Sequence, residues 1–92
     1  MTRYTVVWLE RSQNQLAQIW VESSDRKAIT AAADKIDSEL AYDPDTKGSK
    51  ETEGLRRLRV PPLTVLFEVR SEDRIVEVGS VKQIRKSFNG QS

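Results

Sequence analysis

The stretch that decides the fold runs from Arg57 to Val69 and reads Arg-Leu-Arg-Val-Pro-Pro-Leu-Thr-Val-Leu-Phe-Glu-Val. Its period is two, so Leu58 and Val60 share one side of an extended chain while Arg57 and Arg59 share the other. The two prolines in its middle remove two backbone donors and force a break or turn. The stretch therefore predicts two short strands, each with an apolar and a polar side.

The residues that follow this stretch continue the pattern. Residues 70–73, Arg-Ser-Glu-Asp, are typical of a hairpin turn, and residues 74–82 are rich in Ile and Val. Strands joined by such a short polar turn form an antiparallel hairpin. Residues 83–92 are mostly polar, and we expect them to form a flexible tail.

The residues near the start of the chain predict a strand and a helix. Residues 4–9, Tyr-Thr-Val-Val-Trp-Leu, are β-branched and aromatic, which favours a strand. Ser12 and Gln15 have the spacing of a capping box. Apolar residues then recur at helical spacing, so a helix is expected over residues 12–22.

A second helix and a loop are expected before the deciding stretch. Residues 25–41 carry an apolar stripe at spacings of three and four, which predicts an amphipathic helix that follows the first one closely. Two such helices form an αα-hairpin. Residues 43–54 are polar throughout and predict a mobile surface loop.

Together these elements predict the order β-α-α-β-β-β in a single α+β domain over residues 1–92. The first strand has no partner except the later strands, so we expect a two-layer fold in which the helical hairpin packs on an antiparallel-rich sheet. Trp8 and Trp20 are expected to pack in the core, because large aromatic side chains dominate small cores.

Composition excludes several kinds of chemistry. The 92 residues contain neither cysteine nor histidine, so disulfides and thiolate catalysis are absent, and so are the commonest general base and zinc ligand. The sequence indicates no metal site and no cofactor. It also has no apolar run long enough for a signal peptide or a membrane span, so we expect a cytoplasmic protein that does not enter the membrane.

Charge is distributed unevenly along the chain. Residues 1–54 carry seven basic and ten acidic side chains, a net of −3, whereas residues 55–92 carry eight and four, a net of +4. This asymmetry favours an acidic partner for the second half, although ordinary solvated charge produces the same pattern.

Arg57 and Arg59 are the leading candidate site within this basic half. Two positions apart on one strand, they project from the same face about 7 Å apart, a spacing that suits adjacent phosphates or paired carboxylates. The alternative is a solvent-exposed face kept soluble by its charge. Lys82, Arg85 and Lys86 complete the predicted binding set.

The order of elements, together with the segment from Arg57 to Val69, resembles the RelE/ParE toxin superfamily. Residues 72–78 resemble the next hairpin of that family, and Val78-Gly-Ser-Val81 resembles its final strand. The resemblance covers residues 4–86. It implies the toxic half of a type II toxin–antitoxin pair, which a cognate antitoxin wraps and blocks. Members of this family either cut messenger RNA on the ribosome or poison DNA gyrase.

The resemblance carries some functional residues onto this chain. The RNA-cleaving branch places basic residues on the strand before the turn, and Arg57 and Arg59 match them. It also uses a basic residue just after the last strand, for which Lys82, Arg85 or Lys86 could serve.

Other residues of the RNA-cleaving branch are missing. That branch places an Arg beside an aromatic residue just after the turn, where this chain has Leu63 and Thr64. It also has a catalytic Tyr or His near the C-terminus, and this chain has neither there. Glu68 and Glu77 could replace the missing base, but a Glu on a strand is more often simply solvated. The catalytic residues thus remain unknown.

The sequence leaves three functional hypotheses open. The first two are a toxin that cleaves messenger RNA as an mRNA interferase and a toxin that acts on DNA gyrase; the missing residues favour the second. The third is a non-toxic, non-catalytic binding module with the same fold. A homodimer and a toxin–antitoxin hetero-oligomer are both possible assemblies.

Overall fold

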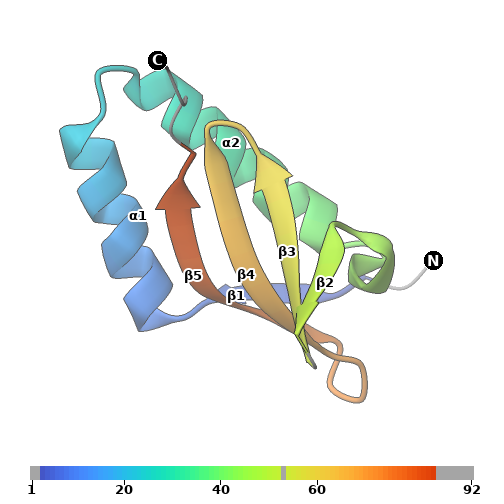
Figure 1. The fold of residues 1–92 in the computed structure, drawn as a ribbon. Helices are drawn as coiled ribbons and strands as arrows, with labels where there is room; N and C mark the ends of the chain where they lie inside the picture. Colours follow the sequence, from blue (N-terminus) through green and yellow to red (C-terminus); the bar gives the residue numbers. More distant parts are fainter. Residues whose placement is uncertain (1–2, 53, 85–92) are drawn as a thin grey trace.

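A computed structural model describes residues 3–52 and 54–84. The chain forms two layers, with two helices packed on one five-stranded sheet (Figure 1). In chain order the elements are β1 (Thr5–Trp8), α1 (Glu10–Glu22), α2 (Arg26–Leu40), the 3-10 helix η1 (Pro44–Thr46), β2 (Ser49–Thr52), β3 (Leu55–Val60), β4 (Leu63–Arg70) and β5 (Ile75–Gln83). The expected two-layer α+β fold is confirmed.

The sheet has the strand order β1-β5-β4-β3-β2. β5 pairs with β1 in parallel and with β4 in antiparallel fashion, and the β4–β3 and β3–β2 pairs are also antiparallel. The predicted turn at Pro61-Pro62, whose peptide bond is cis, joins β3 to β4. The sequence did not predict that the first strand pairs in parallel with the last one.

The core lies between the sheet and α2. Alternate residues of β4 are buried. On β5 the buried residues are Val76, Val78 and Val81, because an extra residue opposite the step from Leu66 to Phe67 shifts the alternation by one position. α2 places one apolar stripe against them. The fully buried side chains of this core cluster are Ile29, Ile36, Leu40, Leu63, Val65, Phe67, Val76 and Val78. The period-two pattern therefore predicted the buried side of β4 correctly.

The predicted cap of α1 is wrong. The helix begins at Glu10, with Leu9 as its N-cap residue, and Ser12 lies inside the first turn. Ser12 is fully buried, and its hydroxyl donates to the carbonyl oxygen of Leu9 at 2.7 Å. The Gln15 side chain accepts a hydrogen bond from the backbone N–H of Val81 at 2.9 Å. β1 ends at Trp8, so this amide serves an N–H of β5 that has no strand beside it.

The segment predicted as a mobile loop contains regular structure. It includes η1 and a strand, β2, that pairs with β3 through the backbone. All four β2 side chains are exposed, so β2 has no buried side and leaves no alternating apolar pattern in the sequence. The sheet therefore has one strand more than predicted.

Two further expectations concern single residues and the chain end. Trp8 is partly buried and packs against the core, as expected, but Trp20 is 42% exposed, so the prediction of a core position for Trp20 is wrong. Residue Gln83 belongs to β5, and the backbone N–H of Ile84 donates to the Pro62 carbonyl oxygen at 2.7 Å. The remainder of the predicted tail, residues 85–92, lies outside the described residues.

Candidate functional site

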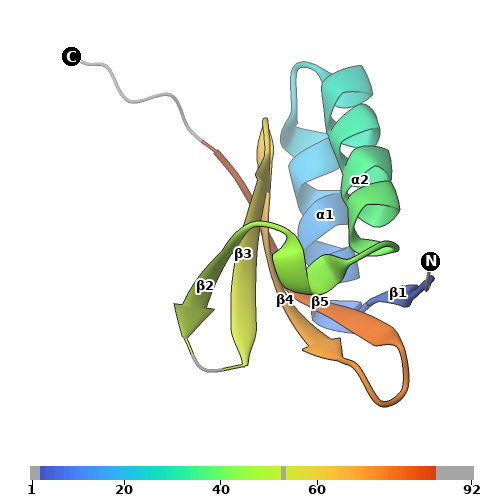
Figure 2. The same ribbon diagram turned by 90° about the vertical axis from the view of Figure 1, so that its right-hand side faces the viewer.

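The sheet has one covered face and one open face. Figure 2 shows both helices on the same side of the sheet, and neither lies on the other side. Because side chains alternate along a strand, the buried residues of β3, β4 and β5 point to the helices and their neighbours point to the open face. The predicted basic residues of these strands therefore lie away from the helices.

Strand register brings residues from three strands together on this face. In one row across the sheet, Thr64 lies between Arg59 and Lys82. Two residues along the strands, Leu66 lies between Arg57 and Ser80. Since adjacent strands lie about 4.8 Å apart, the Cα atoms of Arg59 and Lys82 are roughly 10 Å apart across Thr64. The open face is defined here by Arg57, Arg59, Thr64, Leu66, Ser80 and Lys82.

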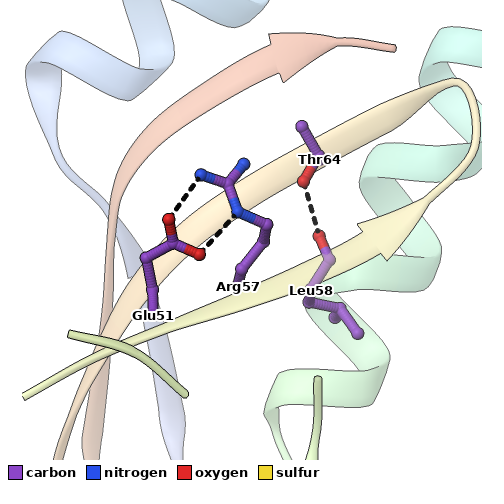
Figure 3. Close-up of polar contacts among 4 residues, drawn as sticks. All are labelled: Glu51, Arg57, Leu58 and Thr64. Carbon is purple, nitrogen blue, oxygen red and sulfur yellow. Dashed lines mark hydrogen bonds and ion pairs between the residues drawn. The ribbon is translucent and has the colours of Figure 1, made fainter. Parts of the chain in front are cut away.

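Arg57 already has a partner on this face (Figure 3). Its Nε donates to Oε1 of Glu51 at 3.0 Å, and its Nη2 donates to Oε2 at 3.3 Å. The hydrogen bonds and the charge of the guanidinium hold the pKa of the Glu51 carboxyl below its ordinary value. Glu51 in turn raises the pKa of Arg57, chiefly through its hydrogen bonds. Glu51 comes from β2, the strand that the sequence did not predict.

Arg59 and Lys82 differ from Arg57 in this respect. Both are exposed, and within residues 3–52 and 54–84 neither forms an ion pair. Two positive charges on either side of a threonine form a surface to which an anion can bind. Arg85 and Lys86, the other two predicted binding residues, lie outside the described residues.

A second charged cluster lies nearer the other end of β4 and β5. Arg70 contacts Glu77 at 3.1 Å and Glu68 at 3.9 Å. The hydrogen bond and charge of Glu77, with a smaller contribution from Glu68, raise the pKa of Arg70. Both glutamates that could have replaced the missing base therefore neighbour an arginine, and this favours ion pairing over a catalytic role.

The open face is better suited to binding an anion than to transferring protons. Glu51 is held in its ionised form by Arg57 and is consequently a weak base. The Thr64 hydroxyl donates to the Leu58 carbonyl oxygen at 3.4 Å, as Figure 3 shows. The described part of the chain also contains no group of three or more carboxylates that could hold a metal ion.

A second surface, which the sequence did not predict, lies on the helix layer. α1 and α2 enclose an apolar groove of about 680 Å³, with Trp8, Leu16 and Trp20 among its lining residues and Asp34 and Asp37 beside them. The Trp8 indole N–H donates to Asp37 at 3.2 Å. The sequence carries one signal for it: three consecutive apolar residues, 19–21, cover more of a helix than one packed face requires.

No helix in the described ranges 3–52 and 54–84 is long and apolar enough to cross a membrane. No family model matches the sequence, and no curated protein matches it either.

Solved structures do resemble this chain. One belongs to the toxin–antitoxin complex RelBE2 of Mycobacterium tuberculosis, with a TM-score of 0.72, 19% identity, and coverage of 90% of this chain and 93% of that one. Another belongs to the chromosomal ParDE toxin–antitoxin system of P. aeruginosa, with a TM-score of 0.64, 15% identity, and coverage of 90% and 98%.

The fold also occurs inside a longer chain, TrmO from Pseudomonas aeruginosa. There the TM-score is 0.60 and the identity 21%, and the match covers 89% of this chain but 36% of TrmO. The RelBE2 and ParDE matches, in contrast, span nearly all of both chains compared. From β1 to β5, the chain has the fold of the RelE/ParE toxins.

Proposed function

We propose that the chain is the toxin-type subunit of a toxin–antitoxin pair, bound in the cytoplasm by a cognate antitoxin. The observation that carries this proposal is the extent of the structural match: chains of two toxin–antitoxin systems share the fold over about nine tenths of this chain. Arg59 and Lys82, which form no ion pair with any described residue, supply an electrostatic surface on which such a protein can hold an anionic target.

We further propose that the protein acts by binding its target and does not cleave RNA. RNA cleavage by attack of a 2′-hydroxyl needs a base for that hydroxyl and positive charge for the phosphorane. Arg59 and Lys82 supply the charge. The chain has no histidine, and the candidate glutamates neighbour an arginine, so no carboxylate among these candidates is left to act as the base. DNA gyrase is therefore the favoured target, because poisoning it requires no nuclease residues.

The antitoxin would contact both surfaces of this protein. An acidic segment suits the open face, where Arg59 and Lys82 are exposed. An apolar segment with basic neighbours suits the helix groove, which combines the exposed ring of Trp20 with the carboxylates of Asp34 and Asp37. Opposite charges at the two surfaces fix the direction in which one partner chain can lie across the molecule.

Co-expression with the product of the adjacent gene tests this proposal. We expect the chain to slow growth when expressed alone, and the neighbouring protein to co-purify with it and restore growth. Normal growth with abundant folded protein, together with no complex, would reject the toxin assignment and favour the non-toxic binding module. The match to part of TrmO indicates that the fold also serves within larger proteins.

Two assays separate the possible targets. We expect the purified chain to inhibit supercoiling by DNA gyrase and to leave ribosome-bound messenger RNA intact. The double variant Arg59→Ala/Lys82→Ala should lose the inhibition. Cuts in messenger RNA that disappear in this variant would instead establish an mRNA interferase and refute binding without cleavage.

A further inference from the structure

β2 is held against β3 by features that have no role in the core. Gly48 has a φ of +64°, and a Cβ atom there would lie 1.9 Å from the Arg57 carbonyl oxygen. The Arg56 guanidinium donates to the carbonyl oxygens of Lys47 and Gly48 at 3.0 and 3.3 Å. A glycine and an arginine together thus fix the start of a strand whose own side chains are all exposed.

This arrangement places Glu51 where it can bind Arg57 at two points. Ser49 pairs with Arg57 in the register, and Glu51 lies at the irregularity between Lys50 and Thr52. Both carboxylate oxygens accept from the guanidinium, at 3.0 and 3.3 Å. A phosphate binds a guanidinium through the same two-point geometry, so the carboxylate occupies the position that a phosphate would take.

The pair is exposed enough to be exchanged. The side chains of Arg57 and Glu51 are 32% and 41% exposed, and exposed ion pairs stabilise proteins only weakly. When one phosphate of a nucleic-acid strand contacts Arg59, the next phosphate can therefore replace Glu51 at Arg57 without disturbing the core. Arg57 and Arg59 are about 7 Å apart along the strand, which suits successive phosphates of one nucleic-acid strand.

We infer that Glu51 is a specificity-determining residue that competes with the phosphates of a single-stranded nucleic acid for Arg57. This inference rests on the anion-binding open face of the proposed function and adds which anions the face prefers. Isolated anions bind between Arg59 and Lys82, whereas a ligand with successive phosphates also gains Arg57 by displacing the carboxylate. Glu51 thereby weakens the binding of every single-stranded nucleic acid. Only a nucleic acid that lies along β3 can contact Arg57.

A double-mutant cycle tests the competition. The probe is a fluorescein-labelled oligouridine RNA, titrated with the wild type, Glu51→Gln, Arg57→Ala and the double variant. We expect Glu51→Gln to tighten binding by roughly three- to tenfold, since it frees one charge-assisted contact. Arg57→Ala should weaken binding more in the Glu51→Gln background than in the wild type.

The salt dependence gives a second measure of the same contact. Each phosphate contact to a single strand adds about −0.7 to the slope of log K against log salt concentration. We expect part of that increment in Glu51→Gln, because the carboxylate still occupies Arg57 in a fraction of the wild-type complexes, and we expect the double variant to lose it. Glu72→Gln, which removes the same charge at the turn between β4 and β5, should leave the slope at the wild-type value.

Two results would overturn the inference. If Glu72→Gln tightens binding as much as Glu51→Gln, net charge alone explains the effect and Glu51 has no specific role. If none of the variants binds the RNA, the competition is refuted, whereas antitoxin capture and the gyrase assay still decide the proposed function separately. Thermal melting of each variant confirms that it is folded.

Discussion

At the scale of single residues, the two tryptophans occupy different environments although both belong to apolar patterns. Trp8 alternates with exposed neighbours in β1, so its ring points to the helices and packs against the core. Trp20 lies one position after Ile19, which turns its ring towards the gap between the helices. There the Arg26 guanidinium stacks over it, 4.5 Å from the ring centroid.

Replacing Trp20 should affect binding more than folding. We expect Trp20→Ala to lower the free energy of unfolding by about 1–2 kcal/mol, whereas Phe67→Ala, at a fully buried position, should cost about 3–5 kcal/mol. Urea denaturation measures both. Trp20→Ala should also weaken antitoxin capture at temperatures where it is fully folded. Equal losses of stability in the two variants would contradict a surface role for Trp20.

The ion pair between Glu51 and Arg57 should give stability a defined pH dependence. Arg57 lowers the pKa of Glu51 in the folded state, so the pair stabilises the fold above the ordinary carboxyl pKa. This contribution is lost as pH falls through the lowered pKa. We expect the melting temperature of the wild type to exceed that of Glu51→Gln at neutral pH and to approach it in acid. A difference that does not change with pH would argue against the pair.

At the scale of elements, β2 depends on a close backbone approach to β3, and the outer edge of β5 depends on one side chain of α1. β2 approaches β3 so closely at Gly48 that any side chain there would meet the backbone of Arg57. Beyond Trp8, β5 has no neighbouring strand on its outer edge, and α1 supplies the amide of Gln15 to Val81. Loss of the close approach at Gly48 or of the Gln15 amide should therefore destabilise the element that depends on it.

Two glycines with positive φ provide a matched test of the β2 contact. Gly48→Ala must both adopt a strained backbone and displace β2, whereas Gly54→Ala at φ +82° meets no atom within 4 Å. We expect Gly48→Ala to destabilise the protein by at least 1 kcal/mol more than Gly54→Ala does, by urea denaturation. It should also tighten RNA binding as Glu51→Gln does. Equal effects of the two substitutions would show that backbone strain alone matters.

Gln15 offers a second test at this scale. Gln15→Ala leaves the Val81 N–H without its partner in a partly buried position, and we expect a loss of about 1–2 kcal/mol. Gln18→Ala removes an exposed contact with Glu22 and should cost far less. Hydrogen exchange of the Val81 amide should accelerate in the first variant only. Unchanged protection of that amide would show that Gln15 is dispensable.

These elements also explain how much could be predicted from the sequence. The strands β3 and β4 were predictable because alternate residues are buried, and α2 was predictable because one apolar stripe meets the sheet. β2 was missed because its pairing uses backbone atoms alone and all its side chains are exposed. Arg57 and Arg59 were correctly placed on one face, but the partner of Arg57 comes from β2. The sequence therefore could not show that Arg57 is paired while Arg59 and Lys82 have no ion pair in the described part of the chain.

At the scale of the whole molecule, the uneven charge of the sequence becomes a difference between two surfaces. The groove of the helix layer has Asp34 and Asp37 beside it, and the open face carries Arg59 and Lys82. An anionic ligand approaching from solution is therefore drawn to one side of the protein, and this orients the encounter before any contact forms.

Charge reversal on each side tests this orientation. We expect Arg59→Glu to weaken oligouridine binding by about tenfold or more, because it removes an attraction and adds a repulsion. Lys35→Glu makes the same change in net charge on the exposed side of α2 and should have a much smaller effect at physiological salt, where charges are screened beyond about 8 Å. Equal weakening in the two variants would show that net charge, and not the open face, governs binding.

The pairing of β1 with β5 has a consequence for the order in which the protein can form during synthesis. Thr5 meets its partner Ile75 only after 70 further residues have been made, and β5 is also the strand that joins β1 to the rest of the sheet. Until then, β1 has no strand to pair with and α1 lacks the strand on which it mainly packs, and contacts so distant in sequence form slowly. Each newly made chain therefore passes through a period in which neither the open face nor the helix groove is complete. A partner protein already present in the cell could reach it during this interval, before the chain is able to act.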